Sequence, residues 1–412
     1  MHKFEPTLQA AQAQLAQVQP QAYAQTRNAL EGAVTRLSPY LTHGLLSLRT
    51  VYETVNARHP LDAKHKLVFE LGWRAYYRHV WAHLGEAIHQ SLHPGLLPED
   101  AYQTTMPADV LQARTGVAAI DLAVRELYAN GYLHNHARMW LASYLVHLRK
   151  VHWHTAAQWM LGYLLDGDVA SNHLSWQWVA GTGSVKPYVF NADNVAKYAP
   201  APWHSPGTVI DTSYEALDRM ARSPRAVEHR FDLRRAGDGV DAPLLLAAPP
   251  AAVWLAPQAD IAAGRDVWLV HPWSLAADAS SLDTEVLRIA VGFSELHAPM
   301  PWSALRWNFV TEGLRARTPH LWWASVDAIT QALKGARSVR WQSEAHADVA
   351  LGTLRQQLKA GEASPKVTVQ TEAPLFTPVA PYCESFAKWW RLSHLANAGH
   401  SDAPGGQTAS VR

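Results

Sequence analysis

Cysteine is almost absent: the chain of 412 residues contains only Cys383. One thiol cannot build a disulfide framework, and it cannot supply a four-cysteine zinc or iron–sulfur site. An excess of one charge is missing too, because 35 acidic residues nearly balance 36 Lys and Arg residues and leave a formal net charge of +1. No global field therefore attracts nucleic acid, and DNA binding would need a local basic patch.

Long apolar runs are also missing. No run reaches the roughly 18 apolar residues that a membrane-spanning helix needs, and the first residues (MHKFEPTLQAAQAQ) lack the apolar core of a signal peptide. We therefore expect a soluble, cytoplasmic protein that has no membrane partner. We predict no metal site.

Tryptophan, in contrast, is abundant, with 18 residues. Most of them are expected in the core, although indoles can also stack on bases or flavins and pass electrons. The chain is longer than one hydrophobic core usually supports, so we expect two domains.

Apolar periodicity divides the chain into regions. Residues 1–205 repeat apolar positions at i, i+3, i+4 and i+7, which predicts an all-helical domain. Residues 206–250 are rich in Pro and charge and are typical of a linker. From 251 to 395, short β-branched or apolar runs alternate with helical segments, which predicts a Rossmann-like parallel α/β domain and a multidomain α and α/β protein. Residues 396–412 are small and polar, and we expect a disordered tail.

Two stretches of the helical region carry candidate chemistry. Thr35 and Ser38 lie in TRLSP, where a helix start could hold phosphate through free N–H groups, and an ordinary N-cap is the alternative. Residues 164–183 (LLDGDVASNHLSWQWVAGTG) place two acids two positions apart, followed by an Asn and two Trp residues. Buried carboxylates need partners, so this stretch predicts a polar site among large aromatic rings.

Five motifs follow one another in this region: GAVTRLSPYLTHGLLS (32–47), FELGWRAYYRHVW (69–81), TGVAAIDLAVREL (115–127), NHARMWLASYLVHLRKVHW (135–153) and residues 164–183. In this order they resemble the FAD-binding helical domain of the DNA photolyase/cryptochrome family. The resemblance implies noncovalently bound FAD, with an Arg138–Asp166 pair at the flavin edge and Asn172 facing the flavin N5. The full set of implied FAD-binding residues is Tyr23, Thr35, Arg36, Leu37, Ser38, Arg138, Asp166, Asp168 and Asn172.

The same resemblance implies a light-driven DNA repair lyase that splits cyclobutane pyrimidine dimers by electron transfer from reduced FAD. The implied partner is DNA containing pyrimidine dimers, bound by a monomer. The implied catalytic pocket comprises Glu70, Trp73, Asn135, Met139 and Trp178, and the implied electron-transfer residues are Trp176, Trp153 and Tyr102.

Two alternatives stay open: a cryptochrome-like flavin photoreceptor without repair activity, and a flavin-binding relic with neither activity. Three features favour the photoreceptor: His136 where the family carries Arg, the lack of an evident third tryptophan, and the permuted domain order described below. Repair is favoured by Glu70, Trp73, Asn172 and Met139.

The second half resembles the antenna domain of the same family. The resemblance rests on residues 301–358 and on PLFTPVAPYCESFAKWW (374–390). In the family this domain precedes the FAD-binding domain, so the resemblance implies a circularly permuted order. It also implies a second, antenna chromophore, whose identity stays open.

Overall fold

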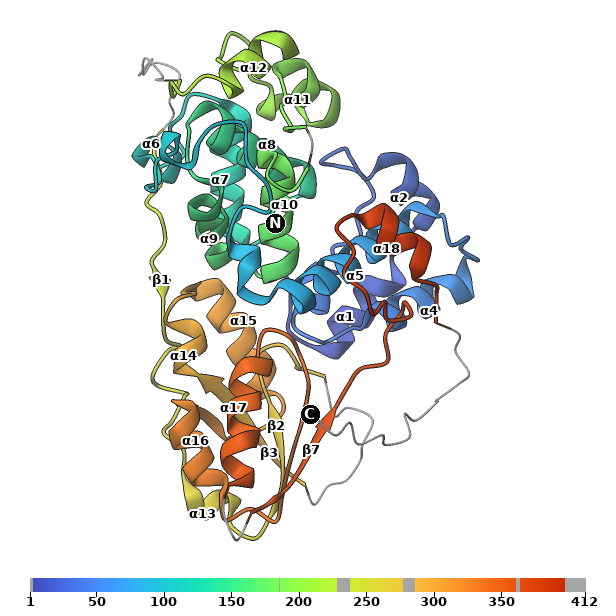
Figure 1. Cartoon of the computed structure of the whole chain (residues 1–412), viewed down its shortest axis with the longest axis vertical. Coiled ribbons are helices and arrows are strands. Elements are labelled where there is room, and N and C mark those ends of the chain that lie inside the picture. Colours follow the sequence, from blue (N-terminus) through green and yellow to red (C-terminus); the bar gives the residue numbers. More distant parts are fainter. Residues whose placement is uncertain (1–2, 185, 228–237, 277–285, 361–363, 397–412) are drawn as a thin grey trace, which may run out of the picture.

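The computed structural model describes residues 3–184, 186–227, 238–276, 286–360 and 364–396. Figure 1 shows the helical region above and to the right of an α/β region that occupies the lower half. The predicted disordered tail lies outside the described residues, apart from residue 396.

Helices make up the first half of the chain, which confirms its predicted helical character. η1, η2 and η4 are 3-10 helices and η3 is a π-helix. The bounds are α1 Leu8–Ala16, α2 Pro20–Thr26, α3 Ser38–Thr42, α4 Leu48–Arg58, α5 Lys66–Leu84, η1 Gly85–His89, η2 Glu99–Ala101, α6 Ala108–Leu111, α7 Ala118–Asn130, α8 Asn135–Ser143, η3 Tyr144–Leu148, α9 Trp153–Tyr163, α10 Val169–Ala180, α11 Ala192–Tyr198, η4 Ala201–Trp203 and α12 Tyr214–Ala221.

Side-chain caps and left-handed glycines set several of these bounds. The hydroxyls of Thr7 and Ser47 accept hydrogen bonds from the first turns of α1 and α4, and Asp168 caps α10 in the same way. Gly181 ends α10 at φ 84°, a conformation that residues with a Cβ avoid.

The α/β region is a five-stranded parallel sheet in the order β5-β3-β2-β6-β7, which confirms the predicted parallel α/β class. The central strands β2 and β3 are almost wholly buried, whereas the edge strand β7 alternates exposed and half-buried residues. The elements are β1 Leu245–Leu246, α13 Ala259–Ala262, β2 Asp266–Val270, β3 Leu287–Phe293, α14 Ser294–His297, β4 Trp302–Ser303, α15 Ala304–Arg315, β5 Leu321–Ala324, α16 Val326–Leu333, β6 Ser338–Gln342, α17 Asp348–Lys359 and β7 Lys366–Gln370. β1 pairs antiparallel with β4.

After β7 the chain leaves the sheet and returns to the helical region. Its last helix, α18 (Phe386–Leu392), packs on α5, as Figure 1 shows at the upper right. Trp390 lies so close to Gly72 that a Cβ there would be 2.4 Å from its ring. The range 251–395, predicted as the α/β domain, thus includes a segment that contacts the helical region.

Two buried apolar clusters form the core. One lies wholly within residues 110–217. The other joins residues from 4–88, 161–174 and 254–389, so the first helices share their core with the sheet and with α18. Within the described residues, no helix is both long and apolar enough to cross a bilayer.

Candidate functional site

Asp166, which follows α9, is the centre of a polar cluster. Its side chain is only 3% exposed. Nη2 of Arg138 on α8 donates to its two carboxylate oxygens at 2.9 and 2.7 Å, and the Ser38 hydroxyl donates to Oδ2 at 2.5 Å. The structure therefore brings together three of the predicted FAD-binding residues from three separate segments.

The backbone before Ser38 is strained. Arg36 has φ 54°, a left-handed conformation that is worth roughly 1–2 kcal/mol of strain for a residue with a Cβ. The Thr35 hydroxyl accepts a hydrogen bond from the Leu37 N–H at 3.4 Å, and Leu37 is buried beneath the turn. Among the described residues, the Arg36 guanidinium makes no hydrogen bond or ion pair. A strained loop that presents an unpaired cation suits an anionic group such as a phosphate.

Asp168 is fully engaged by protein groups. Its Oδ1 accepts the Ser171 N–H at 2.8 Å and so caps α10. Its Oδ2 accepts from Arg74 at 3.2 Å and from Arg78 at 2.5 Å, both on α5. Burial opposes ionisation, but Arg78 and Arg74 hold the pKa of Asp168 well below its usual range. Sequence reasoning missed both arginines, although they lie four apart on a helix that the motif already marked.

Arg78 also contacts residues of the α/β region. Its Nη1 lies 2.6 Å from Oε1 of Glu344, whose other oxygen contacts Nδ1 of His346 at 2.9 Å. Nε2 of His346 in turn accepts the N–H of Val169, the first residue of α10, at 3.1 Å. The α/β region therefore helps to hold the start of the helix that carries Asn172 and Trp176.

A second buried cation explains the glycine between the two acids. Arg306 on α15 donates to the carbonyls of Leu161 at 3.2 Å and Gly167 at 2.7 Å, and it lies 4.0 Å over the Trp302 ring. A Cβ at Gly167 would be 2.4 Å from Nη1 of Arg306. Burial lowers the pKa of Arg306 to about 9. The DGD stretch can therefore take this course only with glycine in the middle.

The aromatic residues predicted for electron transfer lie on neighbouring helices. Trp176 on α10 and Trp153 on α9 are both buried, and the Trp153 indole N–H donates to the Ser91 hydroxyl at 3.0 Å. The Asn172 amide donates to the Ala157 carbonyl at 2.9 Å and so ties α10 to α9.

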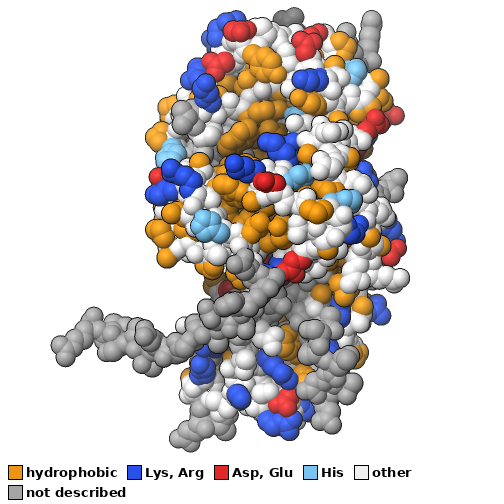
Figure 2. Space-filling model, turned by 90° about the vertical axis from the view of Figure 1, so that its right-hand side faces the viewer, with side chains coloured by type: hydrophobic (Ala, Val, Ile, Leu, Met, Phe, Trp, Pro, Cys, Tyr) orange, Lys and Arg blue, Asp and Glu red, His pale blue; other side chains and the backbone are white. Residues whose placement is uncertain are grey.

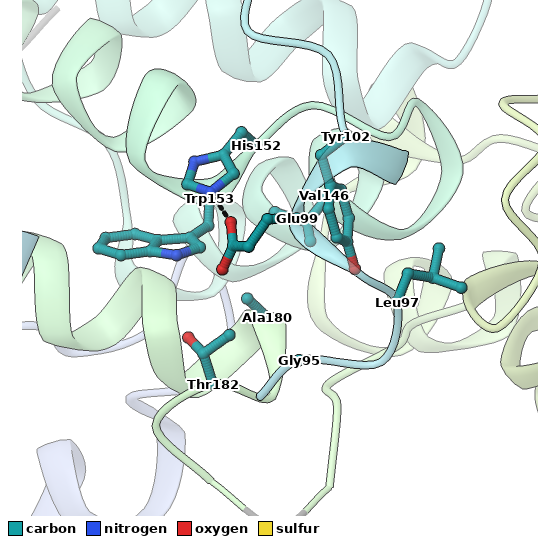
Figure 3. Close-up of a pocket in the computed structure, with 9 residues that line it drawn as sticks. All are labelled: Gly95, Leu97, Glu99, Tyr102, Val146, His152, Trp153, Ala180 and Thr182. Atoms are coloured by element: carbon teal, nitrogen blue, oxygen red, sulfur yellow. Dashed lines mark hydrogen bonds and ion pairs between the residues drawn. The ribbon is translucent and has the colours of Figure 1, made fainter. Parts of the chain in front are cut away.

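Tyr102 lines a small pocket together with Trp153, His152 and Glu99 (Figure 3). The rings form a short series: Tyr102 lies 6.3 Å from His152, and His152 lies 5.9 Å from Trp153. Glu99 forms an ion pair with His152. The structure thus places Tyr102 close to Trp153, with an imidazole between them that sequence reasoning missed.

Glu70 lies on α5 beside an arginine. Its Oε1 is 3.4 Å from Nε of Arg27, and its side chain is 40% exposed. Burial raises the pKa of Glu70 although Arg27 opposes the shift. Burial also raises the pKa of Tyr23, with a further contribution from Glu70. Glu70, Arg27 and Tyr23 therefore form one group at the start of α5.

Both indoles of the predicted pocket already have aromatic neighbours. Trp73 stacks on Phe386 of α18 with a centroid distance of 4.0 Å and an angle of 12°. Trp178 is 39% exposed and lies 5.8 Å from the Tyr188 ring. On α8, the Asn135 amide lies 3.7 Å from the Met139 sulfur. Figure 2, which views the molecule from the right-hand side of Figure 1, shows a hollow lined largely by hydrophobic side chains with a few charged ones.

Known proteins resemble the helical region. Residues 67–201 match the model of the FAD binding domain of DNA photolyase. Curated relatives include a deoxyribodipyrimidine photo-lyase of Streptomyces griseus, 36% identical over 156 residues (37% of this chain, 33% of that protein), and a cryptochrome DASH of Gloeobacter violaceus, 35% identical over 172 residues (40% and 34%). Over residues 67–201 the helical region is therefore similar to the FAD-binding domain of the DNA photolyase/cryptochrome family. Its cofactor is FAD.

The likeness to these family members covers part of each protein. This chain spans about a third of the length of the two curated relatives, 33% and 34%. A solved Synechocystis cryptochrome is 28% identical, with a TM-score of 0.42 over 46% of this chain and 43% of that one. An archaeal photolyase from Sulfolobus tokodaii with two FAD molecules is 27% identical, with a TM-score of 0.40 over 46% and 44%.

The geometry fits the charge pattern of FAD. The unpaired Arg36 and the strained turn around it match a doubly anionic pyrophosphate, and the Arg138–Asp166 pair offers both a donor and an acceptor for a polar ring edge.

Proposed function

We propose that this protein is an FAD-dependent, light-driven DNA lyase that splits cyclobutane pyrimidine dimers. The observation that supports it best is the Arg138–Asp166 pair, which lies within residues 67–201 that match the photolyase FAD-binding domain, together with Ser38, which donates to Asp166 from outside that range. When bound, FAD supplies an electron donor that light can excite. The residues around it must position the cofactor and the two linked pyrimidines of the dimer.

The contacts support the following roles in holding the flavin. Arg36, Ser38 and the turn from Thr35 to Leu37 hold the pyrophosphate, with Tyr23 at the neighbouring helix. Asp166, fixed by Arg138, accepts from the flavin edge. Asp168 acts by fixing the start of α10, because its oxygens are already bonded, and so places Asn172.

The lesion would enter the pocket after flipping out of the duplex, as enzymes that act on bases require. Trp73 and Trp178 offer aromatic faces, and Asn135 and Met139 complete the wall. Glu70, which lies beside Arg27 and is 40% exposed, offers a carboxyl group that can form a hydrogen bond to the reacting bases. Trp176, Trp153 and Tyr102 carry electrons inward, and a second chromophore on the α/β region stays a prediction.

One observation favours the photoreceptor alternative. Phe386 covers one face of Trp73 and therefore occupies a surface that a flipped base would need. Under this alternative, α18 is a permanent part of the pocket wall, the protein binds FAD, and it shows no preference for damaged DNA.

Replacing Trp178 by alanine tests whether the protein is a repair lyase or a photoreceptor. Trp178→Ala is expected to weaken binding to a dimer-containing oligonucleotide by about ten- to a hundredfold, because stacking of a base on an aromatic ring contributes about 1–3 kcal/mol. Binding to intact duplex should hardly change, since phosphate contacts dominate it. Fluorescence anisotropy with damaged and intact oligonucleotides measures both affinities. The exposed position of Trp178 makes loss of folding a minor concern.

Tyr52→Ala, which removes a half-buried ring on α4, is the control and should leave both affinities unchanged.

A second experiment measures repair: the reduced holoprotein is illuminated together with the damaged oligonucleotide, and the recovery of thymine absorbance is followed. If the wild type neither prefers damaged DNA nor restores thymine, the lyase assignment is wrong and the photoreceptor function replaces it.

A further inference from the structure

Three histidines outside the flavin-binding and lesion-binding groups converge on one point. They are His89 at the end of η1, His154 in the first turn of α9 and His173 on α10. One ring nitrogen from each lies within 4.8 Å of the other two. Nδ1 of His89 and Nε2 of His154 are 3.4 Å apart, close to the roughly 3.3 Å that separates two ligands of a tetrahedral metal with bonds of about 2.0–2.1 Å.

His173 is oriented as a ligand would be. It is fully buried, and its Nδ1 lies 3.0 Å from the Val169 carbonyl, to which it donates. Its Nε2 is buried and has no hydrogen-bond partner among the described residues. A backbone carbonyl that fixes one ring nitrogen and leaves the other as a lone-pair donor is the usual arrangement around metal-binding histidines.

The other two histidines complete a site that ligands can reach. Nε2 of His89, remote from His154, lies 3.7 Å from the Glu86 carboxylate, which resembles the carboxylate–histidine pairs that support metal ligands. His89 and His154 are half-buried, which leaves a path for an ion and a water.

We propose that His89, His154 and His173 bind a divalent transition metal ion, with Zn²⁺ the best fit. Three imidazoles and one open position form a common tetrahedral zinc site, in which water takes the fourth position. The ring nitrogens need to approach one another by no more than about 1.5 Å to reach that geometry. The site lies against Trp153, whose ring is 5.5 Å from His154 and 6.2 Å from His173, so the ion would add positive charge beside this tryptophan.

Metal titration of the full-length, tag-free holoprotein tests the proposal. After treatment with a chelator, the protein is dialysed against zinc chloride alone, and bound zinc is measured by mass spectrometry and by competition with a chromophoric chelator. The expected result is one zinc ion per chain. Cobalt chloride in place of zinc should give the visible absorption bands of tetrahedral Co²⁺.

Two variants remove single ligands and retain side-chain volume. His89→Gln and His154→Gln should each weaken zinc binding at least about a hundredfold, since even supporting residues around a metal change affinity by 10–100-fold. His93→Gln is the matched control: His93 is exposed, lies four residues beyond His89 and should leave affinity unchanged. Circular dichroism checks that the variants fold. The proposal is overturned if the wild type retains no zinc, or if both folded variants bind zinc as tightly as the wild type does.

Discussion

Lowering the pH from about 7.5 to about 5 is expected to reduce the free energy of unfolding by about 6 kcal/mol. Three fully buried histidines outside the proposed metal site account for a loss of this size, and the lowered pKa values of His134 and His271 act in the same direction. Burial lowers the pKa of His43 and His297 to about 3 and that of His147 to about 4. In the unfolded chain each would titrate near 6.5, so at pH 5 each contributes about 2 kcal/mol to unfolding.

The sign follows from proton binding. Between pH 6.5 and the pKa values of about 3–4 in the folded protein, these histidines bind protons in the unfolded chain but not in the native structure. The free energy of unfolding therefore falls as the pH falls. A further loss is expected below about pH 4.5, because Asp168 and Glu344 keep pKa values below their ordinary range in the folded protein. A loss of about 6 kcal/mol is comparable with the whole stability of an ordinary domain.

His297 allows a direct test, because neither of its ring nitrogens has a partner among the described residues. Its ring stacks on Trp273 at 5.8 Å and lies 4.3 Å from Trp302, so phenylalanine can occupy the same space. His297→Phe should abolish about 2 kcal/mol of the loss between pH 7.5 and 5, whereas the exposed His93→Gln should change nothing. Urea unfolding at a series of pH values measures both. If the free energy of unfolding depends on pH equally in the wild type and in His297→Phe, the role assigned to His297 is wrong.

Replacing Asp166 by alanine is expected to lower the affinity for FAD about ten- to a hundredfold. The substitution removes the acceptor that Arg138 and Ser38 share and leaves the Arg138 guanidinium without its carboxylate. Hydrogen bonds to charged groups contribute about 1.5–3 kcal/mol, and about 1.4 kcal/mol is a factor of ten in affinity. Flavin absorbance retained through purification, and titration of the apoprotein with FAD, measure the change.

The chain offers a matched control. Asp109 and Arg149 form a similar pair far from the flavin-binding group, with distances of 2.6 and 2.9 Å and side chains 20% and 13% exposed. Asp109→Ala should therefore lower stability without lowering FAD affinity. If Asp109→Ala loses as much flavin as Asp166→Ala, the role of Asp166 is general stability and its assignment to the flavin edge is wrong.

Sequence reasoning succeeded where a local pattern determines the outcome. Helical periodicity before residue 205 and the strand–helix alternation after 251 both gave the correct class of structure. The resemblance to the photolyase/cryptochrome family implied that Asp166 pairs with Arg138, and the two residues are indeed paired. The two class predictions follow from spacings within single helices and strands, whereas the pairing follows from the family resemblance.

Sequence reasoning failed where a contact joins residues that are far apart in the sequence. Arg78 and Glu344 are 266 positions apart, and no spacing rule predicts that they form an ion pair across the two regions. His89, His154 and His173 likewise come from three elements, so no spacing within one element brings them together. The stacking of Phe386 on Trp73 could not be predicted either. Nothing in the sequence around Phe386 shows that the chain returns to the helical region after β7.

The shared core has a consequence for the order in which the chain can fold during synthesis. The cluster within residues 110–217 is complete as soon as that stretch has been made, whereas the first 88 residues bury their apolar faces against residues from 254–389. Residues 4–88 leave the ribosome before residues 110–217 and yet complete their core later, contrary to the usual N-terminal-first order. In refolding followed by pulsed hydrogen exchange, amides of α7 and α8 should gain protection before those of α1 and α4; the reverse order would show that the early helices find a stable core without the sheet.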